Sequence, residues 1–520
     1  MSRIFLYDTT LRDGAQTEGV SFSSRDKLEI LRRLDEFGMD FVEGGWPGSN
    51  PRDDAFFKEA AGMELGCSKL VAFGSTARHG TPAEEDPNLR ALASCKAEWC
   101  CIFGKTWDFH VTEALGIGLE DNIGLIRDSV SFLRGSRKRV IFDAEHFFDG
   151  MGSNMGYALR AIKAAADAGA EWIVLCDTNG GSLPEAVGEA VREVRRAVDV
   201  PLGIHCHNDS DLAVSCTLSA VLAGCTMVQG TVNGIGERCG NANLCTVAPN
   251  LSLKMGMDLG RAEISAMTEL SRYVGEIANM VPNPGMPYVG SRAFAHKGGM
   301  HVSALSKDPR TYEHIDPSSV GNKRRVLVSD MAGRTSIAEK LRELGMDRGN
   351  DDREIMEIVK DLESRGYQFE GADASFELLV KRLRGELEPK FDIAGFRVYT
   401  DDKFDGTLSE ASIKVSDRKG RVEHTAADGN GPVNALDNAL RKGLACFFPE
   451  LDEVRLIDYK VRVLDEGEGT CTGVRVLIRS TDGMEDWTTV GVSVNIIAAS
   501  LVALKDSMEY ALMRRPRTER

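Results

Sequence analysis

The chain has 520 residues, a net charge of −16, a pI near 5.2 and 42% hydrophobic residues, so we expect a folded protein of two or three domains. The acidic balance argues against nucleic acids and anionic membranes as partners, because both are themselves negatively charged. No apolar run is long enough to cross a bilayer, no signal peptide is recognisable and the twelve cysteines form no Cys-x-x-Cys pair, which together indicate a cytoplasmic protein with reduced thiols and no membrane partner.

Short apolar strands alternate with amphipathic helices through the first half of the chain. The expected strands are 4–8, 41–44, 70–73, 99–103, 140–143, 172–177, 202–207 and 227–231, and the clearest helices are 25–37, 154–168, 184–197 and 211–223. Eight strand–helix repeats in about 250 residues predict an α/β fold, a (β/α)8 TIM barrel, over residues 1–281. A doubly wound sheet is the alternative. It usually has a glycine-rich phosphate turn after its first strand, and Thr10-Leu11-Arg12-Asp13-Gly14 is not such a turn.

The pattern changes where Pro282, Pro284 and Pro287 lie close together. From there to residue 388 we expect a mostly helical linker region, with helices at 353–365 and 374–383. Residues 389–520 look duplicated, because 396–442 and 456–512 each contain strands, a Gly- or Asn-bearing turn and a helix. We therefore predict a C-terminal α+β domain of two repeats that serves regulation and dimerisation. The alternative is an ordinary small α+β domain whose halves are similar by chance.

His205 and His207 flank a single residue near the end of the expected seventh strand. Successive side chains of a strand point to opposite faces, so the two imidazoles leave the same face and can bind one divalent metal ion. Asp13 follows the first strand and Asn241 the eighth, which places oxygen ligands at the same end of a barrel. This mixture of ligands suits Mn²⁺, Mg²⁺ or Zn²⁺, whereas a pair of purely structural histidines is the alternative.

Three further side chains follow strand ends. Arg12 can bind a carbonyl or carboxylate oxygen of a substrate, or pair with Asp8 or Glu43. Glu145 follows the fifth strand, where a carboxylate can orient or serve a proton transfer. Thr178 follows the sixth and can donate its hydroxyl to a substrate carboxylate, although Asp-Thr-Asn-Gly is also an ordinary turn sequence.

Three motifs carry a resemblance that extends over residues 3–512. They are Leu-Arg-Asp-Gly-Ala-Gln at 11–16, His-Cys-His-Asn-Asp at 205–209 and Asn-Gly-Ile-Gly-Glu-Arg at 233–238. They resemble the metal-dependent acyltransferases and lyases built on a barrel, and the whole chain is similar to the isopropylmalate, citramalate and homocitrate synthase family. The segments 43–51 and 142–150 look most like the citramalate-forming branch of that family.

The resemblance implies an acyltransferase that condenses acetyl-CoA with a 2-oxo acid. In this branch pyruvate, acetyl-CoA and water give (R)-citramalate and CoA for isoleucine biosynthesis, in a homodimer inhibited by an amino-acid effector, which we expect to be isoleucine. The implied site residues are Asp13, His205, His207 and Asn241 for the divalent metal, Arg12, Gln16 and Thr178 for the substrate, and Arg12, Glu145, His301 and Tyr312 for catalysis. Asp143 is a departure, because some relatives have an aromatic residue two positions before the glutamate, and it changes the pocket expected for the oxo acid.

Other functions fit parts of the same pattern. A 2-isopropylmalate synthase, using 2-oxoisovalerate, differs by a few methyl groups in its substrate, each worth only ~1–3 kcal/mol of discrimination. A homocitrate synthase would need a basic residue for a distal carboxylate, and none stands out in the sequence. A lyase would run the carbon–carbon bond cleavage, but the sensor-like C-terminal domain favours a biosynthetic step. A non-catalytic amino-acid sensor on an inactive barrel would lack a ligand, and all four are present.

Overall fold

The computed structural model describes residues 2–328, 334–347, 349, 351–403, 406–464 and 473–514. The chain forms two compact units, one of Met1–Phe294 with Ile315–Lys323 and one of Ala295–His314 with Arg324–Arg520. The chain therefore passes from the first unit to the second, returns for nine residues, and leaves again.

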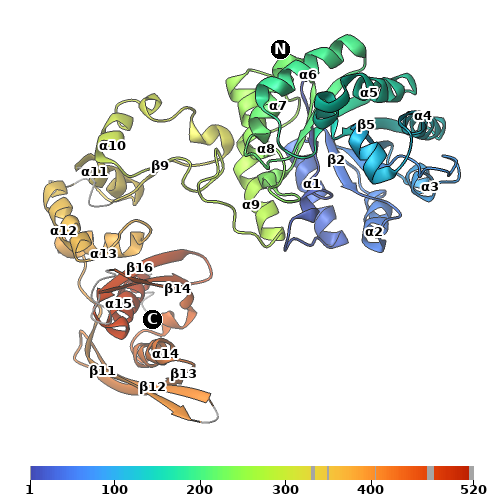
Figure 1. Ribbon diagram of the computed structural model, residues 1–520. Coiled ribbons are helices and arrows are strands. Elements are labelled where there is room, and N and C mark those ends of the chain that lie inside the picture. Colours follow the sequence, from blue (N-terminus) through green and yellow to red (C-terminus); the bar gives the residue numbers. More distant parts are fainter. Residues whose placement is uncertain are drawn as a thin grey trace. The chain divides into compact units, whose positions relative to one another are not determined.

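A closed barrel of eight parallel strands forms the first unit (Figure 1). The strands are β1 (Phe5–Asp8), β2 (Phe41–Gly45), β3 (Lys69–Ser75), β4 (Trp99–Lys105), β5 (Arg139–Glu145), β6 (Trp172–Asp177), β7 (Leu202–Cys206) and β8 (Met227–Gly230). β1 pairs with both β2 and β8, which closes the sheet, so the predicted barrel is confirmed and an open doubly wound sheet is excluded. β7 and β8 end one residue before their predicted ends, because His207 and Thr231 instead form isolated bridges with Asn241 and Asn243.

Helices surround the barrel (Figure 1). They are α1 (Ser24–Phe37), α2 (Pro51–Ala60), α3 (Pro87–Ser94), α4 (Leu119–Gly135), α5 (Phe147–Asp167), α6 (Pro184–Ala197), α7 (Ala213–Ala223), α8 (Leu244–Pro249) and α9 (Met267–Ile277). α5 begins seven residues before its predicted start and contains a non-helical residue, Asn154, which separates its first turns from the predicted segment. Between strands and helices lies the main core, which includes the fully buried Leu6, Ile102 and Leu175.

Bulky side chains form a second core cluster, carried by alternate residues of the barrel strands. It contains Tyr7, Phe41, Val71, Phe73, Trp99, Cys101, Ile141, Trp172, Val174, Cys176 and Met227. Alternate residues of a barrel strand face its interior, so this cluster packs the interior as in other eight-stranded barrels.

The second unit consists of a mostly helical first part and a C-terminal domain of two similar halves (Figure 1). Its first part contains β9 (Ala295–His296) paired with β10 (Arg325–Val326), and helices α10 (Gly299–Leu305), α11 (Arg334–Glu343), α12 (Asp352–Ser364) and α13 (Asp373–Leu383). The halves are β11 (Phe391–Lys403), β12 (Gly406–Asp417), β13 (Val422–Gly429) with α14 (Pro432–Ala445), and β14 (Arg455–Val463), β15 (Val474–Thr481), β16 (Asp486–Ser493) with α15 (Ile496–Arg514). Each half is a three-stranded antiparallel sheet followed by a helix, which confirms the predicted duplicated α+β domain.

The two halves share one apolar core to which both helices contribute, including Leu440 of α14 and Leu504 of α15. A sheet of three strands with one covered face would leave its other surfaces to a partner or to solvent. Within the described ranges, no helix is both long enough and apolar enough to cross a membrane.

Candidate metal centre

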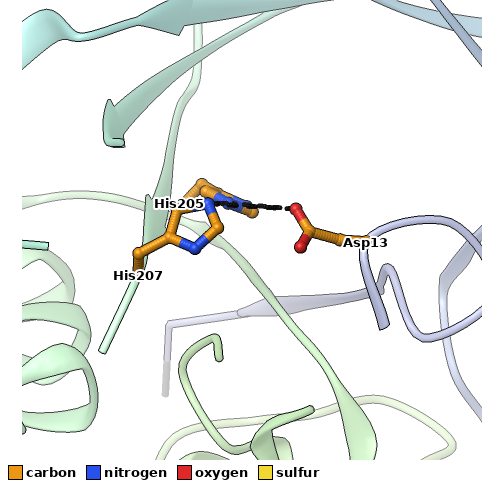
Figure 2. A group of neighbouring side chains, drawn as sticks. All are labelled: Asp13, His205 and His207. Carbon is orange, nitrogen blue, oxygen red and sulfur yellow. Dashed lines mark hydrogen bonds and ion pairs between the residues drawn. The ribbon is translucent and has the colours of Figure 1, made fainter. Parts of the chain in front are cut away.

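An aspartate and a pair of histidines, almost two hundred residues apart in the sequence, converge at one end of the barrel. Asp13 lies in the loop after β1, His205 in β7 and His207 just beyond it. The two histidine Nε2 atoms are 3.4 Å apart, and they lie 3.8 and 3.9 Å from the same carboxylate oxygen, Oδ2 of Asp13. Figure 2 shows both rings turned toward the aspartate, so the structure brings the predicted imidazole pair and the predicted carboxylate together.

Burial sets the protonation state of this cluster. It lowers the pKa of His205 to about 3, with a further contribution from His207, and it also lowers the pKa of His207. Burial would raise the pKa of Asp13, but Arg12 and the two imidazoles outweigh it and hold that pKa below its ordinary value. Near neutral pH the cluster is therefore two neutral imidazoles and one carboxylate, the forms in which these groups bind metals.

A hydrogen bond that His205 donates to Gln229 determines which nitrogen of the His205 ring remains free. His205 Nδ1 lies 3.0 Å from Gln229 Oε1, and Gln229 Nε2 donates to Asp143 Oδ1 at 3.1 Å. Because the amide oxygen can only accept, the imidazole proton belongs on Nδ1, and the lone pair on Nε2 faces Asp13. Gln229 was not among the predicted site residues; the signal was a glutamine in an otherwise apolar strand, directly opposite His205 in register.

Asn241 is placed to add a neutral oxygen ligand. Its Nδ2 donates to Asp13 Oδ1 at 2.9 Å and to the Ile235 carbonyl at 3.2 Å, so the amide orientation is fixed by two acceptors. Its Oδ1 is buried and has no hydrogen-bond partner in the described structure. An orphan buried oxygen beside a carboxylate and two imidazoles fits a divalent cation, which would satisfy it.

Arg12 lies between Glu43 and Asp13 and contacts both carboxylates. Its Nε donates to Glu43 Oε1 at 2.6 Å and its Nη1 to Asp13 Oδ2 at 3.1 Å, while its guanidinium carbon lies 3.9 Å from the centre of the Phe73 ring. Burial disfavours its charge, but Glu43 and Asp13 raise its pKa overall, so it stays cationic. The predicted alternative, an ion pair with Glu43, is thus present together with the contact to Asp13. Arg12 and Gln16 both line a cavity of about 650 Å³.

Glu145 and Thr178 lie at the ends of β5 and β6, but each already has a partner. Glu145 forms an ion pair with Lys105, its register neighbour on β4. Thr178 Oγ1 accepts a hydrogen bond from the backbone N–H of His146 at 2.9 Å.

His146 has a left-handed backbone with φ of 56°, which is uncommon for a residue other than glycine, and its Nδ1 lies 3.1 Å from Asp149 Oδ2. Its position directly after Glu145 was the only sequence signal for it.

His301 and Tyr312 lie together in the second unit. Their rings stack with centroids 4.1 Å apart, and both side chains are exposed. The structure therefore brings these two predicted residues to each other, while their participation in the barrel site stays a prediction.

Comparison with known protein families divides the chain into three parts. Residues 3–274 match the HMGL-like family, residues 288–367 the homocitrate synthase post-HMGL domain-like family, and residues 370–512 the LeuA allosteric (dimerisation) domain. The first match covers the barrel and the third covers both β-β-β-α halves.

Several relatives are similar to this chain over nearly its whole length. An (R)-citramalate synthase of Geobacter sulfurreducens is 54% identical over 98% of both chains, and one of Aquifex aeolicus is 51% identical over 98% of both. A 2-isopropylmalate synthase of Methanocaldococcus jannaschii is 29% identical over 99% of this chain and 95% of its own. This 2-isopropylmalate synthase is thus more distant from the chain than the two (R)-citramalate synthases are.

Proposed function

The chain belongs to the family of the (R)-citramalate synthases, and from this premise we propose that it condenses acetyl-CoA with pyruvate and water to give (R)-citramalate and CoA. The observation that carries the proposal is the buried cluster of Asp13, His205 and His207 at one end of the barrel, held in metal-binding protonation states. The 2-isopropylmalate synthase reaction is not favoured, because relatives of that name are much less similar to this chain than the citramalate synthases are.

A divalent cation, Mn²⁺, Mg²⁺ or Zn²⁺, would be held by Asp13, His205, His207 and Asn241, and when bound it would polarise the oxo group of pyruvate. Arg12 faces the same carboxylate oxygen as the two imidazoles and stays cationic, so it can stabilise negative charge that develops on a substrate oxygen. Gln16 and Thr178 contribute polar groups for binding the oxo acid.

Proton removal from the methyl group of acetyl-CoA is the demanding step. We assign it to Glu145 together with His301 and Tyr312. The resulting enolate of acetyl-CoA adds to the oxo carbon of pyruvate, and water then cleaves the thioester to release CoA. Lys105, paired with Glu145, holds that carboxylate in position. Orienting two bound reactants can supply ~7–11 kcal/mol of the barrier, so the positioning of these groups matters as much as their basicity.

Thiol release from acetyl-CoA tests the substrate assignment. Pyruvate, 2-oxobutanoate, 2-oxoisovalerate and 2-oxoglutarate are compared in parallel with the purified protein and added Mn²⁺, Mg²⁺ or Zn²⁺. We expect pyruvate to give the highest kcat/KM and the His207→Ala variant to lose turnover while it remains folded. Preference for 2-oxoisovalerate would replace the proposal with 2-isopropylmalate formation, and undiminished CoA release by His207→Ala would refute the metal site.

Feedback control by isoleucine is the second part of the proposal, and it is supported by the match of residues 370–512 to an allosteric domain. In this domain a cavity of about 570 Å³ combines opposite charges with an apolar wall, as an α-amino acid with a branched side chain requires. Its lining includes Asp437 and Arg441 beside Val433, Leu451, Val454, Leu456 and Tyr459. The same domain supports a homodimer.

Filling this cavity tests the effector site. We expect Val433→Trp to keep uninhibited citramalate formation and to lose inhibition by isoleucine, whereas Val422→Trp, at an exposed position on β13, keeps both. Full inhibition of the Val433→Trp enzyme would move the effector to another site.

A further inference from the structure

Two arginines face each other directly across neighbouring strands of the second unit. Arg462 on β14 is the register partner of Arg475 on β15, so their side chains leave the same face of the sheet. Four residues further along β15, Arg479 is opposite Asp458 instead, and it also pairs with Asp486 at 2.5 Å. The same strand pair therefore matches opposite charges at one position and sets two like charges against each other four residues away. Like charges directly opposite each other disfavour strand pairing, and an anion between them would offset this.

The arginine pair lines a cavity of about 410 Å³ that also receives two lysines. Lys297 precedes α10 and Lys360 lies in α12, so four cationic side chains come from four separate segments. Two carboxylates, Glu363 and Glu370, share the lining, and Glu370 Oε2 lies 2.8 Å from Lys297 Nζ. The cavity keeps a positive balance within a chain whose net charge is −16.

Neutral groups fix the position of Arg475. Its Nε donates to the Gly366 carbonyl at 2.5 Å and its Nη1 to Gln368 Oε1 at 2.7 Å. Burial and the nearby charge of Arg462 lower the pKa of Arg475, an effect that Glu363 only partly offsets. Among the described residues no carboxylate forms an ion pair with Arg462 or Lys360.

We propose that this cavity is an anion site that binds a phosphate group through Arg462 and Arg475, with Lys360 at its rim. The Arg462 guanidinium can present paired donors to phosphate oxygens, and Arg475 can donate through Nη2, the nitrogen that its bonds to Gly366 and Gln368 do not use. An anion bound by both would offset the repulsion between the two arginines. The volume lies within the range of small-molecule sites, roughly 300–1,000 Å³, so either inorganic phosphate or the phosphate of a nucleotide fits. All the residues that line the cavity belong to the second unit.

The effect of Arg462→Ala provides a test with two readouts. In the absence of phosphate, we expect this variant to melt at a higher temperature than the wild type, because the like-charge contact is gone. Isothermal titration with inorganic phosphate at constant ionic strength should show binding to the wild type and about tenfold or greater weakening in Arg462→Ala, the loss expected for one charge-assisted hydrogen bond. Arg479→Ala, which removes an arginine that is also exposed but paired with Asp486, should melt lower and bind phosphate like the wild type.

Parallel titrations with ATP and with adenosine separate the two sources of phosphate. ATP binding at least as tightly as phosphate, with no binding of adenosine, assigns the site to a nucleotide, whereas tighter binding of phosphate assigns it to the free anion. The proposal is overturned if phosphate and ATP bind Arg462→Ala and Arg479→Ala equally well, if neither binds the wild type, or if Arg462→Ala melts no higher than the wild type in the absence of phosphate.

Discussion

At the scale of single residues, the hydrogen bonds of Gln229 connect the metal centre to the interior of the barrel. Asp143 accepts from the amide nitrogen of Gln229, and the amide oxygen of Gln229 accepts from His205. Asp143 is the residue that departs from the aromatic side chain of some relatives. Asp143 fixes the amide of Gln229, and through that amide it orients the ring of the proposed metal ligand His205.

Removing the Gln229 side chain should therefore weaken metal binding. We expect Gln229→Ala to raise the dissociation constant for Mn²⁺ by about 10–100-fold, the usual effect of losing such a supporting hydrogen bond. Isothermal titration measures it. Ser129→Ala, which removes a buried hydroxyl in α4, is the matched control and should leave Mn²⁺ affinity unchanged. Equal Mn²⁺ affinity in Gln229→Ala and the wild type would show that Gln229 does not orient His205.

Asp143 also predicts a pH dependence of stability. Burial, followed by the charge of Glu43, raises the pKa of Asp143 to about 7, well above that of an unfolded aspartate, which is about 3.9. Below the unfolded pKa, Asp143 is protonated in both the folded and the unfolded metal-free protein. As the pH rises from there toward 7, ionisation favours the unfolded state, so the free energy of unfolding falls.

Replacing the carboxyl by an amide removes this loss, because an amide does not ionise in this pH range. The Asn oxygen can still accept the hydrogen bond from Gln229. Relative to the wild type, Asp143→Asn should gain stability between pH 4 and 7 by at most about 1.4 kcal/mol per pH unit. Urea unfolding of the metal-free proteins at pH 5 and pH 7 gives the two differences. A difference that does not change with pH would mean that Asp143 is ionised in the folded state.

At the scale of elements, the loop between β8 and α8 is shaped around Asn241. Gly236 in this loop is buried, and a Cβ atom there would lie 2.1 Å from Asn241 Nδ2 and 3.1 Å from Asp13 Oδ1. Its backbone angles are open to any residue, so the requirement for glycine comes from the close approach of two proposed metal ligands.

Gly236→Ala should displace Asn241 and reduce both Mn²⁺ affinity and kcat while the barrel remains folded. Circular dichroism checks the fold, and titration with citramalate assays checks the site. Gly135→Ala adds its methyl group where no atom lies within 4 Å, so it should change neither quantity. A Gly236→Ala enzyme with unchanged Mn²⁺ affinity would show that the loop accommodates the methyl group without moving Asn241.

The barrel could be predicted from sequence because its strands are short, apolar and regularly spaced, and α6 was predicted at both of its ends, from Pro184 to Ala197. α2 was missed, although Asn50 caps it and Pro51 begins it, because its ten residues show little separation of polar and apolar faces. The cluster of Asp13, His205 and His207 could be predicted because Asp13 follows β1 and the two histidines flank one residue at the end of β7. The ion pair of Lys105 with Glu145 could not, because it depends on the register of β4 and β5, which the sequence alone does not reveal.

At the scale of the whole molecule, the barrel and the second unit have separate apolar cores. Ligands that bind only one unit should stabilise that unit alone, since binding to the native state adds RT ln(1 + [L]/Kd) to its stability. Chains with two such cores often unfold in more than one step.

Calorimetry should therefore resolve two transitions. Saturating Mn²⁺ at about 100 times its Kd adds ~2.7 kcal/mol to the barrel and raises one transition, while isoleucine raises the other. His207→Ala should abolish the Mn²⁺ shift and leave the isoleucine shift intact. A single transition that both ligands raise together would mean that the two units unfold as one.

The path of the chain between the units bears on how inhibition reaches the chemistry. Residues 295–314, which carry His301 and Tyr312, belong to the same compact unit as the LeuA-like domain, although residues 315–323 beyond them return to the barrel unit. Both ends of the segment 295–314 connect to the barrel unit, whereas its packing belongs to the regulatory unit. The two rings to which we assign the proton transfer are therefore joined to the first unit by the chain and to the second by their contacts.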